Sequence, residues 1–451
     1  MFLLLLYLLV DKMKINPKTD IKQIFLSGIE SVLPDKLIKS QVRWSNNVLS
    51  IQNHSFYLPD FEKIFVIGAG KATALMAKEI ESILGNYISA GHIVVKYQHK
   101  CALNIIEITE AGHPLPDENG RKAAQRILTI AKQAGSHDLV ICLFSGGASA
   151  LLADCPDEIS LSDLITTNDL LIKSGASIQE INTVRKHISK LKGGQLAKEI
   201  YPAQTVSLIL SDVIDDRLDV IASGPTYPDP TTFSEAYEIL KKYELINKVP
   251  LSVVQYLKRG IAGEISETPK SDDSIFSKVY NIIIGNNKMA LEAAGCKAKE
   301  LGYQAHVITD NLQSNIEETA NFILSTIEKF KEKSHKTPIC FLFGGEPTVK
   351  VTSNGLGGRN QHLALYLATK LKNMPGITIL CGGTDGTDGP TDAAGAIVDA
   401  STIQTAKEKH ILPMDYLKKS DAYHFFKQVG GHLITGSTKT NVMDMIIAII
   451  E

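Results

Sequence analysis

Residues 64–84 read IFVIGAGKATALMAKEIESIL: a short apolar run, a glycine turn and a helical pattern in succession. An apolar, β-branched run that ends in glycine is typical of a buried strand, and apolar side chains at helical spacing follow it. Similar strand patterns lie at 92–96, 138–144 and 205–211, with helical patterns between them. Such alternation predicts parallel strands joined by crossover helices.

A polar segment separates this series from a second one. Residues 258–278 are polar and nearly without pattern, which indicates a linker or an exposed loop. Strand patterns then resume at 279–286, 304–309, 338–345 and 377–383. We therefore expect an α/β fold of two Rossmann-like domains with mainly parallel sheets.

The 451 residues allow two or three domains. We expect an apolar extension, an N-terminal α/β domain, a linker and a C-terminal α/β domain, at 1–13, 14–260, 261–278 and 279–451. The first ten residues, MFLLLLYLLV, are shorter than the ~20 apolar residues of a membrane span. They also lack the basic start and cleavage site of a signal peptide, so an over-extended start or a dispensable tail is favoured over an anchor.

Charge and cysteine content exclude several classes of protein. The net charge is -2, from 47 basic and 49 acidic residues, which argues against broad attraction to nucleic acid or to an anionic membrane. The 6 cysteines form no C-x-x-C pair, so a zinc or redox motif is not expected. Buried, reduced thiols in a cytoplasmic protein are the favoured interpretation.

The first candidate loop contains Gly68, Gly70 and Lys71, between a strand and a helix. Its glycines would let the backbone approach a phosphate, and Lys71 would supply charge. A dinucleotide-binding fingerprint is disfavoured, because Thr73 replaces the expected small residue and Lys96 stands where an acid is expected. A tight packing turn with a solvated lysine is the alternative.

Two further loops follow strands of the first series. Residues 145–149 read SGGAS, in which small residues and two hydroxyls can surround an anion; the candidates are Ser145, Gly146, Gly147 and Ser149. Asp212 closes the strand TVSLILS, where a carboxylate can act as a base or a metal ligand. We expect His113, in the turn GHPLPDENG, to be structural rather than catalytic.

The second series supplies a charged pair and a run of acids. Gly344, Gly345 and Glu346 follow one strand, and Arg359 lies in a later glycine loop, so Glu346 and Arg359 could hold a metal and a phosphate. The stretch GGTDGTDGPTD at 382–392 alternates acids with glycines after another strand. Its carboxylates, Asp385 and Asp388 among them, could present oxygens to Mg²⁺.

Together these segments resemble the glycerate kinases of the MOFRL type. The resemblance covers nearly the whole chain from about Ile21 and rests on eight pieces in the expected order, among them VIGAGKA, AGHPLPDENG, LFSGGASALL, GGRNQHLAL and GTDGTDGPTDAAGAIVD. It implies two α/β domains with an active site in the cleft between them, and transfer of the ATP γ-phosphoryl group to D-glycerate, usually with Mg²⁺.

The resemblance also suggests roles for residues. Lys71, Asp212 and Arg359 match the family's proposed active-site set, whereas the metal role of Glu346, Asp385 and Asp388 rests on their strand-end positions. Asp212 would orient or deprotonate the attacking hydroxyl. The loops SGGAS and TGSTKTN depart from the family pattern, which affects nucleotide or substrate affinity rather than the fold.

Several expectations complete this interpretation. We expect the protein to bind D-glycerate and ATP, and neither nucleic acid nor a membrane. A homodimer is the expected assembly. Phosphorylation of the 2-hydroxyl is favoured, although no motif reports which hydroxyl reacts. The alternatives are a hydroxypyruvate reductase and a non-catalytic sensor of sugar acids or nucleotides.

Overall fold

The computed structural model describes residues 16–331 and 337–451, so the apolar run at 1–10 lies outside the described residues. The chain forms two compact units, and both are discontinuous in sequence. The N-terminal unit contains Leu33–Asn286 and Lys439–Val442. The C-terminal unit contains the described residues up to Val32, together with Asn287–Thr438 and Met443–Glu451.

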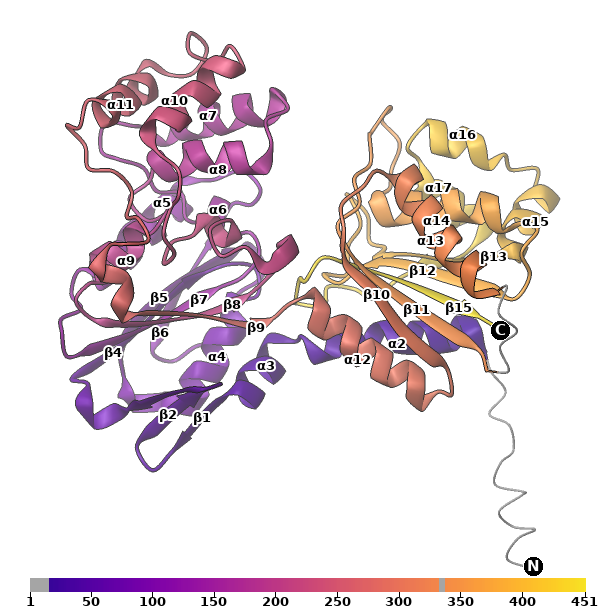
Figure 1. Ribbon diagram of the computed structural model, residues 1–451, viewed down its shortest axis with the longest axis horizontal. Helices are drawn as coiled ribbons and strands as arrows, with labels where there is room; N and C mark the ends of the chain where they lie inside the picture. Colours follow the sequence, from indigo (N-terminus) through magenta and orange to yellow (C-terminus); the bar gives the residue numbers. More distant parts are fainter. Residues whose placement is uncertain (1–15, 332–336) are drawn as a thin grey trace, which may run out of the picture. The chain divides into compact units, whose positions relative to one another are not determined.

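The N-terminal unit is built on a six-stranded sheet whose strand pairs are all parallel (Figure 1). In spatial order its strands are β6 (Ile106–Ala111), β5 (Ile88–Lys96), β4 (Lys63–Ala69), β7 (Asp138–Phe144), β8 (Gln204–Leu210) and β9 (Val279–Gly285). The predicted parallel strands with crossover helices are confirmed for this unit. Because the strands are parallel, their carboxyl ends all lie at the same end of the sheet.

Apolar, β-branched runs place this sheet in the core. Every residue of β7 is buried, and helices α4 (Thr73–Leu84) and α5 (Glu118–Ala131) contact the sheet. Asp117 caps α5 by accepting a hydrogen bond from the Gly120 N–H group. A small antiparallel sheet, which the strand patterns did not predict, precedes β4; it contains β1 (Val42–Ser45), β2 (Val48–Ile51) and β3 (His54–Tyr57).

A group of helices with its own apolar core belongs to the same unit: α7 (Leu161–Lys173), α8 (Ile178–His187), α10 (Phe233–Lys242) and α11 (Leu251–Ile261). The expected linker differs from what the structure shows. Part of it is the end of α11, and a 3-10 turn at Ser274–Lys278 leads into β9. Glu267 of this segment accepts a hydrogen bond from Phe233 N–H and pairs with the buried His187. These two contacts bind the segment to α10 and α8.

The C-terminal unit has a mixed six-stranded sheet. In spatial order its strands are β10 (Gln304–Leu312), β11 (Ile339–Gly345), β15 (Asp444–Ile450), β12 (Ile377–Gly383), β13 (Gly395–Asp399) and β14 (His432–Leu433). Only β10 and β11 pair in parallel; the last strand, β15, inserts antiparallel between β11 and β12. The expectation of a mainly parallel sheet therefore describes the N-terminal unit, not this one.

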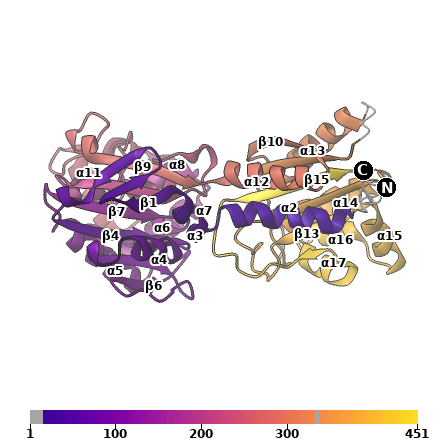
Figure 2. The ribbon, with the colours of Figure 1, turned by 90° about the horizontal axis from the view of Figure 1, so that it is seen from below.

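The opening helix α2 (Pro17–Ser31) is part of the C-terminal unit. It contacts α12 (Asn287–Glu300), β12 and β15, and Figure 2 shows it beside α12. Phe25 is fully buried against Gly382, where a Cβ would lie 2.9 Å from the ring. The expected boundary at residue 14 therefore differs from the structure, as does the assignment of β9 to the second domain.

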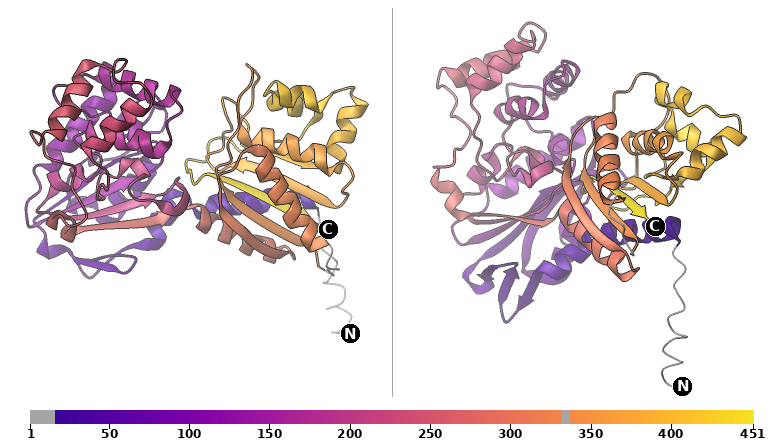
Figure 3. Two further views of the ribbon diagram at one scale, coloured as in Figure 1. Left: turned by 45° about the horizontal axis from the view of Figure 1, so that its top comes forward. Right: turned by 45° about the vertical axis from the view of Figure 1, so that its right-hand side comes forward.

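Helices α13 (Ile316–Lys331) and α14 (Arg359–Leu371) pack on one face of this sheet, and α2 and α12 lie on the other (Figures 1 and 3). Shorter helices, α15 (Ala400–Glu408), α16 (Pro413–Lys418) and α17 (Ala422–Val429), complete the unit beside α14. Within the described ranges, no helix is both long enough and apolar enough to cross a membrane.

Candidate active site

Three neighbouring strands of the N-terminal unit bring candidate residues together. Lys71 follows β4, Gly146 follows β7 and Asp212 follows β8, and these strands pair in the order β4, β7, β8. The Lys71 N–H group donates a hydrogen bond to the Gly146 carbonyl at 2.9 Å. The parallel sheet thus gathers three residues that lie far apart in sequence.

Gly146 allows the Asp212 carboxylate to approach the main chain. A Cβ at Gly146 would lie 2.0 Å from Asp212 Oδ2, a distance at which the carboxylate would have to move. The same oxygen accepts a hydrogen bond from Asn441 Nδ2 at 3.2 Å. Sequence reasoning did not single out Asn441; its only signal was its place in the unusual TGSTKTN loop.

The two serine hydroxyls of the SGGAS loop have partners inside the protein. Ser145 Oγ is buried, accepts a hydrogen bond from Ala72 N–H at 3.0 Å and lies 3.1 Å from Thr73 Oγ1. Ser149 Oγ lies 2.9 Å from Ser223 Oγ. These bonds hold the loops in place, so an anion here would be bound mainly through backbone N–H groups.

The glycines near Lys71 also serve close packing. A Cβ at Gly68 would lie 2.3 Å from the Leu143 carbonyl oxygen, and one at Gly70 would lie 2.1 Å from Ser145 Oγ. The packing turn that was considered as an alternative therefore describes these two glycines well. Their cofactor-binding role stays a prediction.

The C-terminal unit places Arg359 between two carboxylates. Its Nε and Nη2 donate to Asp444 Oδ2 and Oδ1 at 2.5 and 3.0 Å, a bidentate pair, and Nη2 lies 2.6 Å from Glu346 Oε1. Strand register explains this meeting, because Asp444 at the start of β15 pairs with Gly345 of β11 and Gly383 of β12. Sequence reasoning missed Asp444; an acid at the start of the apolar run DMIIAII was the available signal.

The contact between Arg359 and Asp444 affects the pKa values of both side chains. Burial opposes the charge on Arg359, but the nearby Asp444 and Glu346 carboxylates raise the pKa of the guanidinium above its ordinary value. Burial raises the pKa of Asp444, and Arg359 opposes this rise. The side chain of Asp444 is 1% exposed and that of Arg359 is 33% exposed, so the guanidinium remains the accessible partner.

Asp388 positions the helix that carries Arg359. Its carboxylate accepts hydrogen bonds from the N–H groups of Asn360 and Gln361, at 3.0 and 2.8 Å, in the first turn of α14. Burial is the main cause that raises the pKa of Asp388 to about 6. The oxygens of Asp388 are therefore occupied by the helix start, which does not suit a metal ligand.

The other two metal candidates are more exposed than Asp388, although Glu346 Oε1 is paired with Arg359. Glu346 and the half-buried Asp385 offer carboxylate oxygens, the ligand type that Mg²⁺ prefers. Asp385 Oδ1 also accepts from Thr387 N–H at 3.0 Å, which orients it in the turn. Among residues 16–331 and 337–451, no group of three or more His, Cys, Asp or Glu side chains is arranged to hold a metal. Gly344 and Gly345 pack closely against Asn287 and Leu312.

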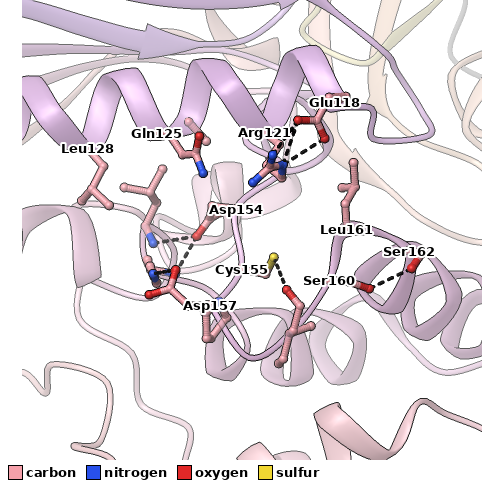
Figure 4. A pocket seen from close by; sticks show the side chains of 15 residues that line it. Glu118, Arg121, Gln125, Leu128, Asp154, Cys155, Asp157, Ser160, Leu161 and Ser162 are labelled. Atoms are coloured by element: carbon pink, nitrogen blue, oxygen red, sulfur yellow. Dashed lines mark hydrogen bonds and ion pairs between the residues drawn. The ribbon is translucent and has the colours of Figure 1, made fainter.

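A cavity of about 490 Å³ lies elsewhere in the N-terminal unit, between α5, the loop at 154–160 and the start of α7 (Figure 4). None of the candidate site residues lines it. Its charged side chains are already paired, Arg121 with Glu118 at 2.6 Å and Lys190 with Asp157 at 2.6 Å. We therefore place the candidate site at the strand ends and not in this cavity.

Comparison with known proteins agrees with these features. Family models match residues 20–258, described as a domain of unknown function (DUF4147), and residues 339–444, described as the MOFRL family. The chain is 42% identical to a D-glycerate 2-kinase of Thermotoga maritima, over 95% of this chain and 97% of the relative. It is 43% identical to a glycerate 2-kinase of Pyrococcus horikoshii, over 96% and 98%. The crystal structure of a glycerate kinase from Thermotoga maritima superposes with a TM-score of 0.84 at 41% identity, covering 96% of this chain and 99% of that one.

The two α/β units, together with relatives and a solved structure named glycerate kinases, define an enzyme of the phosphotransferase class. With relatives above 40% identity over nearly the full length of both chains, the assignment narrows further. The chain belongs to the glycerate kinase family of the MOFRL type. A more distant relative from Agrobacterium vitis, 38% identical over 84% of this chain and 85% of its own length, is named a putative hydroxypyruvate reductase.

Proposed function

We propose that this protein transfers the γ-phosphoryl group of ATP to the 2-hydroxyl of D-glycerate. The observation that carries the proposal is the strand-end cluster of Lys71, Gly146 and Asp212, in a chain 42% identical to a D-glycerate 2-kinase. Lysine and carboxylate side chains beside a glycine loop are the groups that phosphoryl transfer requires for positioning and charge neutralisation.

The reaction is an in-line displacement. The glycerate hydroxyl oxygen forms a bond to the γ-phosphorus of ATP while the bond from that phosphorus to the leaving oxygen of ADP breaks. Asp212 accepts the hydroxyl proton, and the Asn441 N–H group holds its Oδ2 in place. Lys71 neutralises charge on the transferring phosphoryl group.

Arg359 acts through its charge, and Asp444 fixes its orientation. The bidentate bond leaves the guanidinium one-third exposed, so it can contact an anionic oxygen of glycerate or ATP. Mg²⁺ would neutralise charge on the ATP phosphates when bound, and Glu346 and Asp385 are the residues that would hold it. The location of the site in a cleft between the two units stays a prediction.

The test is ADP release coupled to a reporter enzyme, with D-glycerate, ATP and Mg²⁺ and with the product resolved by phosphorus NMR. We expect release that depends on D-glycerate, and a product phosphorylated at the 2-hydroxyl. Asp212→Asn keeps the shape but removes the base, and we expect it to lower kcat by roughly 10²–10⁴-fold. Wild-type turnover in both Asp212→Asn and Arg359→Ala would contradict the assignment.

The two alternatives make different predictions. A hydroxypyruvate reductase would oxidise a nicotinamide cofactor when hydroxypyruvate is added, which absorbance measures directly. Lys96, at the end of β5, occupies the position where a nicotinamide site needs an acid, so we expect no change. A sensor would bind glycerate or ATP without releasing ADP. The expected homodimer and cytoplasmic location stay predictions.

A further inference from the structure

His113 lies beside Lys71 although the two follow different strands. His113 comes two residues after β6, and Lys71 comes two residues after β4. A Cβ at Gly147 would lie 2.9 Å from His113 Cδ2, 3.0 Å from His113 Nε2 and 3.4 Å from Lys71 Cε. The Cδ2–Nε2 edge of the imidazole and the end of the lysine side chain therefore converge on Gly147, whose φ of 88° and missing Cβ leave room for both.

Three basic residues act on His113. They are Lys71, Lys96 and His99, and they act on it electrostatically. His99 is fixed in this group, because its Nδ1 lies 3.0 Å from the Lys71 carbonyl oxygen. Together with burial, which acts most strongly, these neighbours lower the pKa of the half-buried His113 to about 4, although a hydrogen bond to its own backbone opposes the change. The imidazole is therefore neutral near pH 7 and carries one N–H donor.

The acids of the same loops are engaged elsewhere. Glu110 lies 3.4 Å from Lys100 and accepts a hydrogen bond from Gln98 N–H at 2.6 Å. Asp117 accepts from Tyr97 Oη at 2.7 Å and from Gly120 N–H at 2.9 Å. Glu110 acts on the neighbouring His99, but neither carboxylate is among the groups that act on His113.

We propose that His113 and Lys71 bind an anionic oxygen beside Gly147, with the imidazole N–H donating a hydrogen bond and the ammonium supplying charge. The ligand is a carboxylate or a phosphoryl group, the two anionic groups that the proposed substrates carry. The inference rests on the proposed function for the identity of those substrates, but binding of an anion at this point is independent of turnover. It replaces the structural role that the sequence indicated for His113.

A kinetic test separates binding from packing. His113→Phe keeps a ring against Gly147 but removes the N–H group, and we expect it to raise KM for one substrate by roughly 10–100-fold, the effect of losing a hydrogen bond to a charged group. His113→Gln places an amide N–H near the position of Nε2 and is expected to restore much of this loss. A raised KM for D-glycerate identifies the carboxylate as the ligand, and a raised KM for ATP identifies a phosphate.

The matched control is His137→Phe. His137 is exposed and directly precedes β7, so it lies at the amino-terminal ends of the strands, whereas His113 lies at their carboxyl ends. We therefore expect wild-type kinetics for this variant. A purely structural role for His113 predicts a lower melting temperature for both His113→Phe and His113→Gln, with both KM values unchanged. That result would overturn the proposal.

A second measurement does not depend on turnover. In protein labelled with ¹⁵N-histidine, the His113 signal is identified by its absence from His113→Gln, and its titration is followed with D-glycerate, ATP or inorganic phosphate. We expect at least one of them to raise the pKa of His113, because a bound anion favours the imidazolium form. An unchanged titration with all three would overturn the proposal. A shift in the pKa of His113 without kinase activity would support anion binding at His113 and contradict the proposed function. Failure of the binding proposal and failure of the proposed function can therefore be told apart.

Discussion

At the scale of single residues, the position of the Asp212 carboxylate depends on the absence of a side chain at Gly146. We predict that Gly146→Ala displaces Asp212, since the added Cβ would lie 2.0 Å from Oδ2. A displacement of about 1 Å at a reacting group can lower kcat roughly 10²-fold. The measurement is steady-state kinetics together with thermal unfolding.

Gly135→Ala is the control for this substitution. Gly135 lies in the loop before β7, away from the carboxyl ends, and the nearest atom to its added Cβ is 3.7 Å away. Its kcat should equal that of the wild type. An unchanged kcat in Gly146→Ala would show that Asp212 is not positioned by this contact.

The Arg359–Asp444 pair gives a prediction about stability. Arg359→Met leaves the buried Asp444 carboxylate without its bidentate partner, and we expect the free energy of unfolding to fall by roughly 3 kcal/mol. Adding Asp444→Asn removes the buried charge and should recover part of that loss without restoring activity. Urea unfolding of the two single variants and the double variant measures the coupling; additive effects would contradict a direct pair.

Asp388 gives a prediction about pH. Its pKa is raised from 3.8 to about 6 in the folded protein, so folding favours its protonated form. Its contribution to stability is therefore greatest below about pH 4 and is lost as the pH rises towards 6. We expect the free energy of unfolding of the wild type, relative to Asp388→Asn, to decrease over this range and to be constant above it. Urea unfolding at several pH values checks this, with the exposed Asp415→Asn as the control.

Candidate site residues could be named from the sequence where a strand pattern ended in a charged or glycine-rich loop. Lys71, Asp212 and Arg359 carried this signal. The contacts could not be predicted, because each depends on a neighbour distant in sequence: Asn441 for Asp212 and Asp444 for Arg359. The sequence pattern also could not show that Asp388 caps a helix, since Asp and Gly alternate equally well in a metal-binding turn.

At the scale of elements, all eight predicted strand patterns are strands in the structure. Each was a short β-branched run bounded by glycine or polar residues, which is a strong local signal. The pairing of the strands was harder to predict from the sequence. The C-terminal run that forms β15 has no local feature to show that it inserts antiparallel between β11 and β12, because its partners are chosen by the sheet as a whole.

Helix α2 gives the prediction at this scale. Phe25 is fully buried against the C-terminal sheet, whereas its neighbour Leu26 is 40% exposed. We expect Phe25→Ala to lower the free energy of unfolding of this unit by about 3–5 kcal/mol, and Leu26→Ala to have little effect. Urea unfolding checks both, and hydrogen exchange in α12, which α2 contacts, locates the loss. Equal effects in the two variants would contradict the packing of α2.

At the scale of the whole molecule, the two units differ in their dependence on the C-terminus. The six strands of the N-terminal sheet all come from residues 63–285, whereas the C-terminal sheet needs β15 between β11 and β12. We predict that deletion of 443–451 abolishes hydrogen-exchange protection in β11 and β12 but preserves it in β4 and β7. Deletion of Glu451 alone, which is exposed and follows β15, is the control. Retained protection in β11 would contradict this account.

The discontinuity of the units has a consequence for biosynthesis. Helix α2 is among the first described segments to leave the ribosome, but its partners β12 and β15 are among the last. The part of its apolar face that α12 does not cover therefore waits for β12 and β15 while some 350 or more residues are translated, a delay of roughly 20–70 s at about 5–20 residues per second. During that interval this part of α2 is an exposed apolar surface, and its packing against the sheet can be completed only after β15 has been translated.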